Sequence, residues 1–412
     1  MGDLLRRLAA CAGLALFGFA AGPALAGTVT TASAFVGSNG AVPTDGNLLY
    51  SGQTLFGATY GGGANDLGAI FALPAAGGVA AAAIHSFGGS DGKHPNGSLV
   101  ADAAGNLYGT TADGGTDDLG TVFKLAKPAS ASGAWTLTLL HSFTGPDGAH
   151  PAAGVTLGAD GALYGTAYEG GTVPCAGVLF YPAGCGTVFR LTIAGSFRLL
   201  HTFSGAQFDG AGPASNLVVD PSGVVIGTTS EATNSGDGGS LFAISPTSGF
   251  VNVTEFFPKA LQGYPVGNIA RDAAGNVYGM TALAGGLGSS VQGVGIFEVT
   301  AETHKQFLLK ILTDQVSRSG VTRDGAGNLL GTVTGSRMDA GVHDGGLVFE
   351  LSPNGTLTTL ASLGFANAAP FGGVILDPSG TIWGTSSAGG QICGSSASPS
   401  AAGCGTVFTV KP

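Results

Sequence analysis

The feature that most constrains this chain is a sequence frame that recurs along almost its whole length. In its clearest copy, residues 102–125, the frame reads DAAGNLYGTTADGGTDDLGTVFKL, with a pivot glycine in Leu-Tyr-Gly and a phenylalanine in Thr-Val-Phe. Both occur seven times, and the pivot glycines recur at a period of 52 to 62 residues. Repeats of this kind stack into one continuous body rather than separate domains. The pivots are Gly57, Gly109, Gly165, Gly227, Gly279, Gly331 and Gly384, and the phenylalanines are Phe71, Phe123, Phe189, Phe242, Phe297, Phe349 and Phe408.

Each repeat has the pattern of four short strands. The first follows a proline and ends at an Asp-x-x-Gly turn, the second and third hold LYGTT and TVFKL, and the fourth ends in His-Ser-Phe or its equivalent. Charged residues make up only 10% of the chain and glycines number 75, a composition of strands and tight turns with little helix. About fifty residues per four-stranded unit is typical of a propeller blade. We interpret the turn aspartates as structural: Asp102, Asp220, Asp272, Asp324 and Asp377.

The two ends of the chain complement each other. Residues 28–35 resemble the last strand of a repeat whose earlier strands are missing, and residues 405–410 form a third strand with no fourth. Pairing the two would close a ring. The sequence therefore predicts an all-β fold over residues 27–412, a seven-bladed β-propeller whose last blade is built from both termini.

The same register predicts the core. The residue before each pivot glycine, such as Tyr108, and the phenylalanine series should fill the space between adjacent sheets. We expect the pivot to be glycine because a Cβ there would push neighbouring blades apart. Three histidines share one repeat position beside a phenylalanine, which favours hydrogen-bonded blade residues over ligands. They are His85, His141 and His201.

Residues 1–26 are typical of a secretory signal. Arg6 and Arg7 precede an apolar run, and Ala-Leu-Ala precedes Gly27. The alternative is a lipoprotein motif at Cys11, but the apolar segment comes mainly after that cysteine. Cleavage after residue 26 predicts a protein exported to the medium or the periplasm.

The charge limits the partners. Removing Asp3, Arg6 and Arg7 with the signal leaves 24 acidic and 13 basic residues, a formal charge of −11. This balance argues against nucleic acid and anionic membranes as partners. No second apolar run is long enough to span a bilayer. We expect a monomer, without cofactor or metal.

At this point the residues resemble a known family. Residues 107–125 and 140–143, with LYGTT, Gly-Gly, GTVFKL and LHSF, are similar to the GloVer tandem repeat of exported bacterial proteins, which carry varied sorting tails of the choice-of-anchor type. The resemblance covers residues 27–412. It implies a secreted or surface-attached extracellular propeller and no established activity. This chain ends at Pro412 without such a tail, so the resemblance does not imply anchoring here.

Any ligand should meet the loop face. This name denotes the propeller face that carries the loops between second and third strands, such as residues 112–119, and those between blades, such as 88–92. His94 and His150 occupy equivalent interblade positions on it, where turn hydrogen bonding explains them equally well. Acids on residues 112–119 could bind calcium or form a solvated turn. The low-specificity ligand-binding candidates are His94, His150, Asp113, Asp117, Asp118, Arg337, His343 and Asp344.

Two loops carry all the cysteines outside the signal. Counted from pivot glycine to phenylalanine, the loop segments of blades 3 and 7 span 24 residues, against 14 in blades 1 and 2. These blades are not neighbours in a seven-fold ring, so only the local pairings Cys175–Cys185 and Cys393–Cys404 fit. A zinc site is the competing interpretation, but the two pairs cannot share a metal.

Three functions remain open. The first is a non-enzymatic binding or scaffold propeller that holds an extracellular glycan, polymer or protein through the loop face. The second is a polysaccharide lyase or hydrolase, which needs two carboxylates, or a base with a cation, near the channel. The third is a structural envelope or matrix protein without a specific ligand. We identify no catalytic residues from the sequence.

Overall fold

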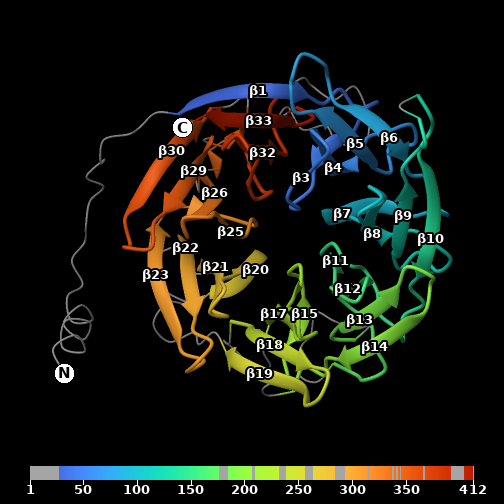
Figure 1. Ribbon diagram of the computed structural model, residues 1–412, viewed down its shortest axis with the longest axis vertical. Helices are drawn as coiled ribbons and strands as arrows, with labels where there is room; N and C mark the ends of the chain where they lie inside the picture. Colours follow the sequence, from blue (N-terminus) through green and yellow to red (C-terminus); the bar gives the residue numbers. More distant parts are fainter. Residues whose placement is uncertain are drawn as a thin grey trace.

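The protein is a ring of antiparallel sheets around a central axis (Figure 1). The computed structural model describes residues 27–411 except 131, 176–183, 207–208, 232–237, 256–262, 284–292, 314, 336–337, 340–341, 344, 365–366 and 391–402. These described residues contain no α-helix and form seven blades. The predicted seven-bladed β-propeller is therefore confirmed, while the predicted signal, residues 1–26, lies outside the described part.

The first three blades run in order from the inner to the outer strand. Blade 1 contains β2 (Ala41–Pro43), β3 (Leu49–Ser51), β4 (Thr54–Gly61), β5 (Ala69–Pro74) and β6 (Ala82–Ser86). Blade 2 contains β7 (Lys93–Ala101), β8 (Leu107–Asp113), β9 (Thr121–Ala126) and β10 (Thr136–Ser142). Blade 3 contains β11 (Thr156–Leu157), β12 (Ala162–Ala167), β13 (Thr187–Thr192) and β14 (Phe197–Thr202).

The next three blades follow the same order, with interrupted inner strands in blades 4 and 6. Blade 4 contains β15 (Ala211–Pro213), β16 (Val218–Val219), β17 (Val225–Glu231), β18 (Ser240–Ser245) and β19 (Gly249–Glu255). Blade 5 contains β20 (Gly263–Arg271), β21 (Val277–Leu283), β22 (Gly293–Val299) and β23 (Gln306–Thr313). Blade 6 contains β24 (Gln315–Val316), β25 (Thr322–Arg323), β26 (Leu329–Gly335), β29 (Gly346–Leu351) and β30 (Leu357–Leu363).

Blade 7 closes the ring with both ends of the chain. It contains β31 (Ile375–Leu376), β32 (Ile382–Ser386), β33 (Thr406–Lys411) and, as its outer strand, β1 (Thr28–Ala34). Strands β1 and β33 are antiparallel, with Thr28 opposite Lys411 and Ala34 opposite Thr406. Figure 1 shows β1 lying along the outside of β33. The predicted closure is confirmed.

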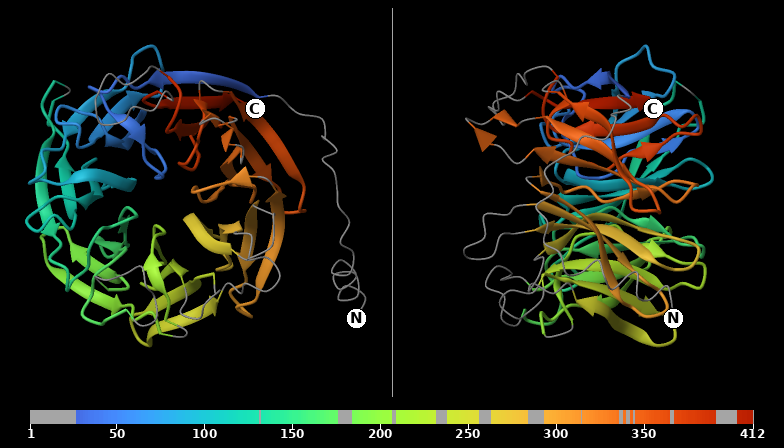
Figure 2. Two further views of the ribbon diagram at one scale, coloured as in Figure 1. Left: turned by 180° about the vertical axis from the view of Figure 1, so that it is seen from behind. Right: turned by 90° about the vertical axis from the view of Figure 1, so that its left-hand side faces the viewer.

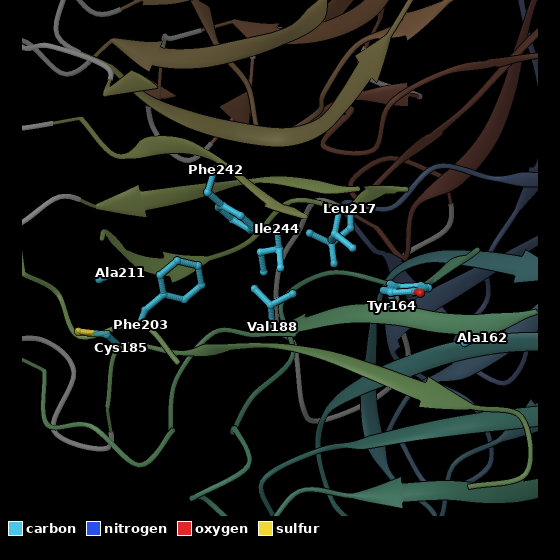
Figure 3. Close-up of a cluster of buried hydrophobic side chains, with 10 residues drawn as sticks. Ala162, Tyr164, Cys185, Val188, Phe203, Ala211, Leu217, Phe242 and Ile244 are labelled. Atoms are coloured by element: carbon cyan, nitrogen blue, oxygen red, sulfur yellow. The ribbon is translucent and has the colours of Figure 1, made fainter. Parts of the chain in front are cut away.

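The core lies between blades, as predicted. Seven clusters of buried apolar residues each join two adjacent blades. Between blades 3 and 4, for example, one cluster contains Tyr164 and Val188 of blade 3 and Phe242 and Ile244 of blade 4, with Val188 beside Ile244 (Figure 3). Burying each large aromatic contributes about 2–3 kcal/mol to stability.

The pivot glycines have a different cause from the one we predicted. Gly109 lies directly opposite Phe123 in the sheet, and a Cβ on Gly109 would come within 2.7 Å of Cζ of that ring. The other six pivots face their own phenylalanine in the same way, at 2.5 or 2.6 Å. The glycine therefore makes room for an aromatic ring of its own blade, not for the neighbouring blade.

The Asp-x-x-Gly turns form the face opposite the loop face, here called the turn face, with Asp102–Gly105 as one example. The Asp102 carboxylate accepts hydrogen bonds from the backbone N–H of Ala104 and Asn106 and from the Tyr108 hydroxyl, at 3.0, 2.9 and 2.9 Å. Gly105 has φ of 82°. Partial burial opposes ionisation, but the bonds from Asn106 and Tyr108 outweigh it and hold the pKa of Asp102 below its usual range. The structural interpretation of these aspartates is confirmed.

The repeated histidines are also structural. In each of the three interblade turns an aspartate carboxylate lies 2.6–2.9 Å from Nε2 of the histidine. The same carboxylate accepts a backbone N–H at the start of its turn. Each imidazole also meets the edge of the neighbouring phenylalanine. The pairs are His85 with Asp91, His141 with Asp147, and His201 with Asp209.

Blade 6 adds an element that we did not predict. A two-stranded hairpin, β27 (Met338–Asp339) and β28 (Val342–His343), lies within its loop between second and third strands. The side view in Figure 2 shows this hairpin projecting from one side of the ring. No described helix is long and apolar enough to cross a membrane.

Candidate functional site

Two histidines from adjacent blades share one carboxylate on the loop face. His94 lies in β7, Asp113 ends β8, and His150 precedes the inner strand of blade 3. Nδ1 of His94 is 2.7 Å from Oδ2 of Asp113, and Nδ1 of His150 is 3.0 Å from Oδ1. The side chains of all three residues remain partly exposed, at 25%, 36% and 25% for His94, His150 and Asp113. Of the predicted candidates, these are the ones that the structure brings together.

The backbone at the two histidines belongs to the fold. Both precede a proline and have positive φ, 55° at His94 and 50° at His150, and each N–H donates to the preceding blade. Val42 and Ala369, at the equivalent positions of blades 1 and 7, also have φ of 55°. The propeller therefore sets this backbone but leaves the side chain free. An imidazole here is not needed for folding.

An exposed tyrosine extends the pair of histidines. The ring of Tyr60, at the end of β4 in blade 1, lies parallel to the His94 ring, with centroids 4.4 Å apart and an interplanar angle of 5°. Tyr60 is 44% exposed. Partial burial and the charge of Asp113 raise the pKa of Tyr60, so its hydroxyl stays protonated at neutral pH. We call Tyr60, His94, Asp113 and His150 the loop-face cluster.

The other two acids of this loop have separate environments. Asp118 accepts from the N–H of Gly114 at 2.8 Å and from Nζ of Lys93 at 2.9 Å, and the Lys93 bond lowers the pKa of Asp118. Asp66 makes the same turn bond in blade 1, so the Asp118 turn belongs to the repeat. Asp117 is exposed. Within the described ranges, no group of three metal-ligating side chains is assembled, and the calcium interpretation has no support in this geometry.

The structure describes no side chain for the three remaining candidates. Arg337 and Asp344 lie outside the described residues. His343 belongs to β28, but its side chain is not described.

The first predicted disulfide is confirmed. Cys175 and Cys185 are bonded across the long loop of blade 3. Cys404 is also disulfide-bonded, and Cys393, its predicted partner, lies outside the described residues. Disulfides of this kind are compatible with export.

The channel entrance on the loop-face side carries a further acid and cation. Asp45, Arg318 and Phe371 lie at equivalent positions in blades 1, 6 and 7, in the segments that precede β3, β25 and β31. Burial raises the pKa of Asp45 to about 6, against the opposing effect of the Arg318 charge. The Arg318 guanidinium lies 5.2 Å from the centroid of the Phe371 ring. We call Asp45 and Arg318 the entrance pair.

Sequence reasoning missed Tyr60 and the entrance pair. In the aligned repeats, Tyr60 stands where blade 2 has Ala112 and blade 4 has Ser230. Blade 3 also has a tyrosine there, Tyr168, while the other blades have Ala, Ser or Thr, so an aromatic in only two of seven repeats was the available signal. Asp45 could have been found in the same way, because the other aligned inner strands lack an acid there.

Comparisons with known proteins agree with this architecture. The model of the Gloeobacter/Verrucomicrobia repeat matches residues 19–183, which is less than half of the chain and supports a repeat family. No protein of curated function matches the sequence.

Two solved structures share the fold. Oligogalacturonate lyase from Vibrio parahaemolyticus is 12% identical with a TM-score of 0.55, over 95% of this chain and 98% of that one. A putative 6-phosphogluconolactonase from Bacteroides uniformis is 17% identical with a TM-score of 0.51, over 80% of this chain and 88% of that one. At these identities the likeness concerns the fold alone.

Proposed function

We propose that this protein is an exported binding propeller that holds a neutral glycan at the loop-face cluster. The stacked Tyr60 and His94 rings carry this proposal. An exposed aromatic ring offers an apolar face to the C–H groups of a sugar, while its hydroxyl remains a hydrogen-bond donor. Beside it, Asp113 and the two imidazoles supply the polar groups that fix the orientation of sugar hydroxyls.

The charge supports a neutral ligand. The cluster contains the carboxylate of Asp113, and the nearest cation, Lys93, is already paired with Asp118. With a formal charge of −10 for the whole chain, an acidic polymer would be repelled. Export is part of the proposal, since the Cys175–Cys185 bond suits an oxidising compartment. N-terminal sequencing of the exported protein should begin at Gly27.

The test uses two tyrosines of nearly equal exposure. Tyr60 is 44% exposed, and Tyr264, at the position in blade 5 equivalent to His94, is 43% exposed but lies outside the cluster. Affinity electrophoresis and calorimetry with cellulose oligomers, starch, chitin oligomers and a β-1,3-glucan should identify a ligand. Tyr60→Ala should lower its affinity about five- to thirtyfold, which corresponds to the loss of one stacked aromatic contact of about 1–2 kcal/mol, and Tyr264→Ala should not. Equal effects of both variants, or no binding by any of these glycans, would reject the proposal.

A polysaccharide-cleaving enzyme is the second candidate, and the entrance pair favours it. A carboxyl whose pKa is about 6 exchanges protons near neutral pH, and Arg318 could stabilise an adjacent developing negative charge. Such an enzyme should release reducing ends or unsaturated products from polysaccharides. Activity should rise as pH increases through about 6 if Asp45 is the base, and Asp45→Asn should abolish it. Unchanged activity in Asp45→Asn would exclude this role.

A further inference from the structure

A cavity of about 430 Å³ lies on the axis, on the turn-face side of the channel. Arg271 and Arg323 line this cavity and show where it lies. They end the inner strands of blades 5 and 6, directly before the turn aspartates. Amide side chains of Asn47, Asn216 and Asn268 contribute polar groups from blades 1, 4 and 5. A volume of this size is in the range of small-molecule sites.

Side chains that line this cavity are hydrogen-bonded to one another across the ring. Nδ2 of Asn268 in blade 5 lies 3.4 Å from Oγ of Ser98 in blade 2, across the ring. The same Ser98 hydroxyl accepts the backbone N–H of Asn47 at 2.9 Å. The Asn47 amide reaches Oγ1 of Thr322 in blade 6 at 3.5 Å. These bonds join four blades in the wall of the pocket, and its lining shares no residue with the loop-face cluster.

The pocket has the opposite charge to the protein. Arg271 and Arg323 are the charged side chains among the described residues that line it, and none of those residues is acidic. Turn aspartates lie beside both arginines: Oδ2 of Asp220 is 3.6 Å from a terminal nitrogen of Arg271, and the pKa of Asp272 is lowered against its partial burial by turn hydrogen bonds and by the charge of Arg323. In a chain with a formal charge of −10, two arginines facing one cavity favour an anion.

Two lining residues also carry unpaired polar atoms. Nε of Arg271 and Oδ1 of Asn47 are buried and have no hydrogen-bond partner among the described residues. The N–H at Nε of Arg271 requires a hydrogen-bond acceptor, and Oδ1 of Asn47 requires a donor. A bare anion such as acetate provides only acceptors, whereas a hydroxylated acid provides both.

We propose that this pocket binds a small sugar acid, with its carboxylate on Arg271 and Arg323 and its hydroxyl groups on the asparagine amides. Guanidinium groups suit this role because their planar N–H groups match a carboxylate. The amides of Asn47, Asn216 and Asn268 can each donate to or accept from a hydroxyl. The pocket thus distinguishes a sugar acid from the corresponding neutral sugar by charge and from a simple carboxylate by its hydroxyl groups.

Isothermal titration calorimetry with glucuronate, glucose and acetate tests this directly. Glucuronate and glucose share the ring and differ in the carboxylate, and acetate has the carboxylate alone. We expect binding of glucuronate only, weakened severalfold by 0.5 M NaCl because the attraction is ionic. Binding of glucose equal to that of glucuronate, or no binding of glucuronate at millimolar concentration, would overturn the proposal.

Variants locate the binding. Arg271→Gln and Arg323→Gln should each lower glucuronate affinity at least about tenfold, and Arg198→Gln, which removes an exposed arginine from the outer strand β14, should not. Circular dichroism and thermal unfolding check that each variant folds. Should one glutamine variant fail to fold, the other and Arg271→Lys, which keeps the charge without the planar fork, serve instead. Tyr60→Ala should leave glucuronate binding unchanged, so the two proposed sites can fail separately. Equal loss in Arg198→Gln would contradict the assignment.

Discussion

The two faces of the propeller use aspartate in different ways. On the turn face, Asp102 and its equivalents accept hydrogen bonds from their own turn and from an aromatic or polar side chain of their own blade. On the loop face, Asp113 holds side chains from two blades, His94 and His150, and makes no such turn. The turn-face carboxylates recur around the ring, whereas the arrangement around Asp113 on the loop face does not.

This difference separates what the fold requires from what it permits. A residue that returns with the same partner in several repeats is explained by the repeat, as with His85, His141 and His201 and their aspartates. At some positions the backbone conformation is the same in several blades but the residue type differs. The repeat does not explain the side chain at such a position, so its presence needs another reason. The loop-face cluster and the axial pocket meet this second description. The following predictions test the contrast, from the largest expected effect to the smallest.

The first prediction concerns the core that supports both faces. Phe123→Ala should lower the free energy of unfolding by about 3–5 kcal/mol, because it removes a fully buried ring and leaves a cavity opposite Gly109. Chemical denaturation measures the change. Phe307→Ala, at an outer-strand residue that is 46% exposed, should change stability by less than about 0.5 kcal/mol. Similar losses in both variants would contradict the assigned core.

The loop face should depend on its covalent bond. Replacing Cys175 and Cys185 together by serine should lower stability by about 3 kcal/mol, since the bond closes a short loop and limits the unfolded chain. Denaturation of wild type and the double variant, with and without reductant, measures this. Intact mass tests both predicted bonds, because four free thiols in the exported protein would be inconsistent with them.

Removing a turn-face carboxylate should destabilise the protein in a pH-dependent way. Asp102→Ala should cost about 1–3 kcal/mol at neutral pH through its lost hydrogen bonds. Because the folded pKa of Asp102 is lowered, its ionised form stabilises the fold above the unfolded pKa of about 4, and this contribution disappears as pH falls through the folded pKa.

Urea denaturation at neutral and acid pH checks the sign. The difference between wild type and Asp102→Ala should shrink on acidification, and a difference that grows would refute the assignment. Asp117→Ala, at an exposed acid of the loop face, is the control and should change stability by less than about 0.5 kcal/mol.

The smallest change in stability should come from the loop-face cluster. Asp113→Asn should alter the free energy of unfolding by no more than about 1 kcal/mol, because its contacts with His94 and His150 are partly exposed. Glycan affinity should nevertheless fall about tenfold, since the two imidazoles lose their shared acceptor. Asp117→Asn on the same loop is the matched control for binding. A large stability loss without a specific binding defect would place Asp113 with the structural aspartates of the turn face.

The sequence was sufficient for the fold because each blade restates the same short-range pattern. Turn chemistry, the Gly109–Phe123 type of pair and the complementary ends all follow from positions within one repeat. The candidate sites depend on contacts between repeats. The sequence identified His94 and His150 as candidates, but their shared contact with Asp113 depends on how two neighbouring blades pack. The pocket at Arg271 and Arg323 requires side chains that meet across the ring, such as Asn268 and Ser98, which lie 170 positions apart.

The pairing of β1 with β33 has a consequence for folding. The first strand of the propeller pairs with its last strand, so one edge of blade 7 cannot form until the whole propeller has been synthesised. Until then β1 is an unpaired edge that can recruit strands from other chains. Contacts so distant in sequence also make ring closure a slow step. Truncation of the last strand should therefore open the ring at one defined joint and favour exchange of β1 between molecules.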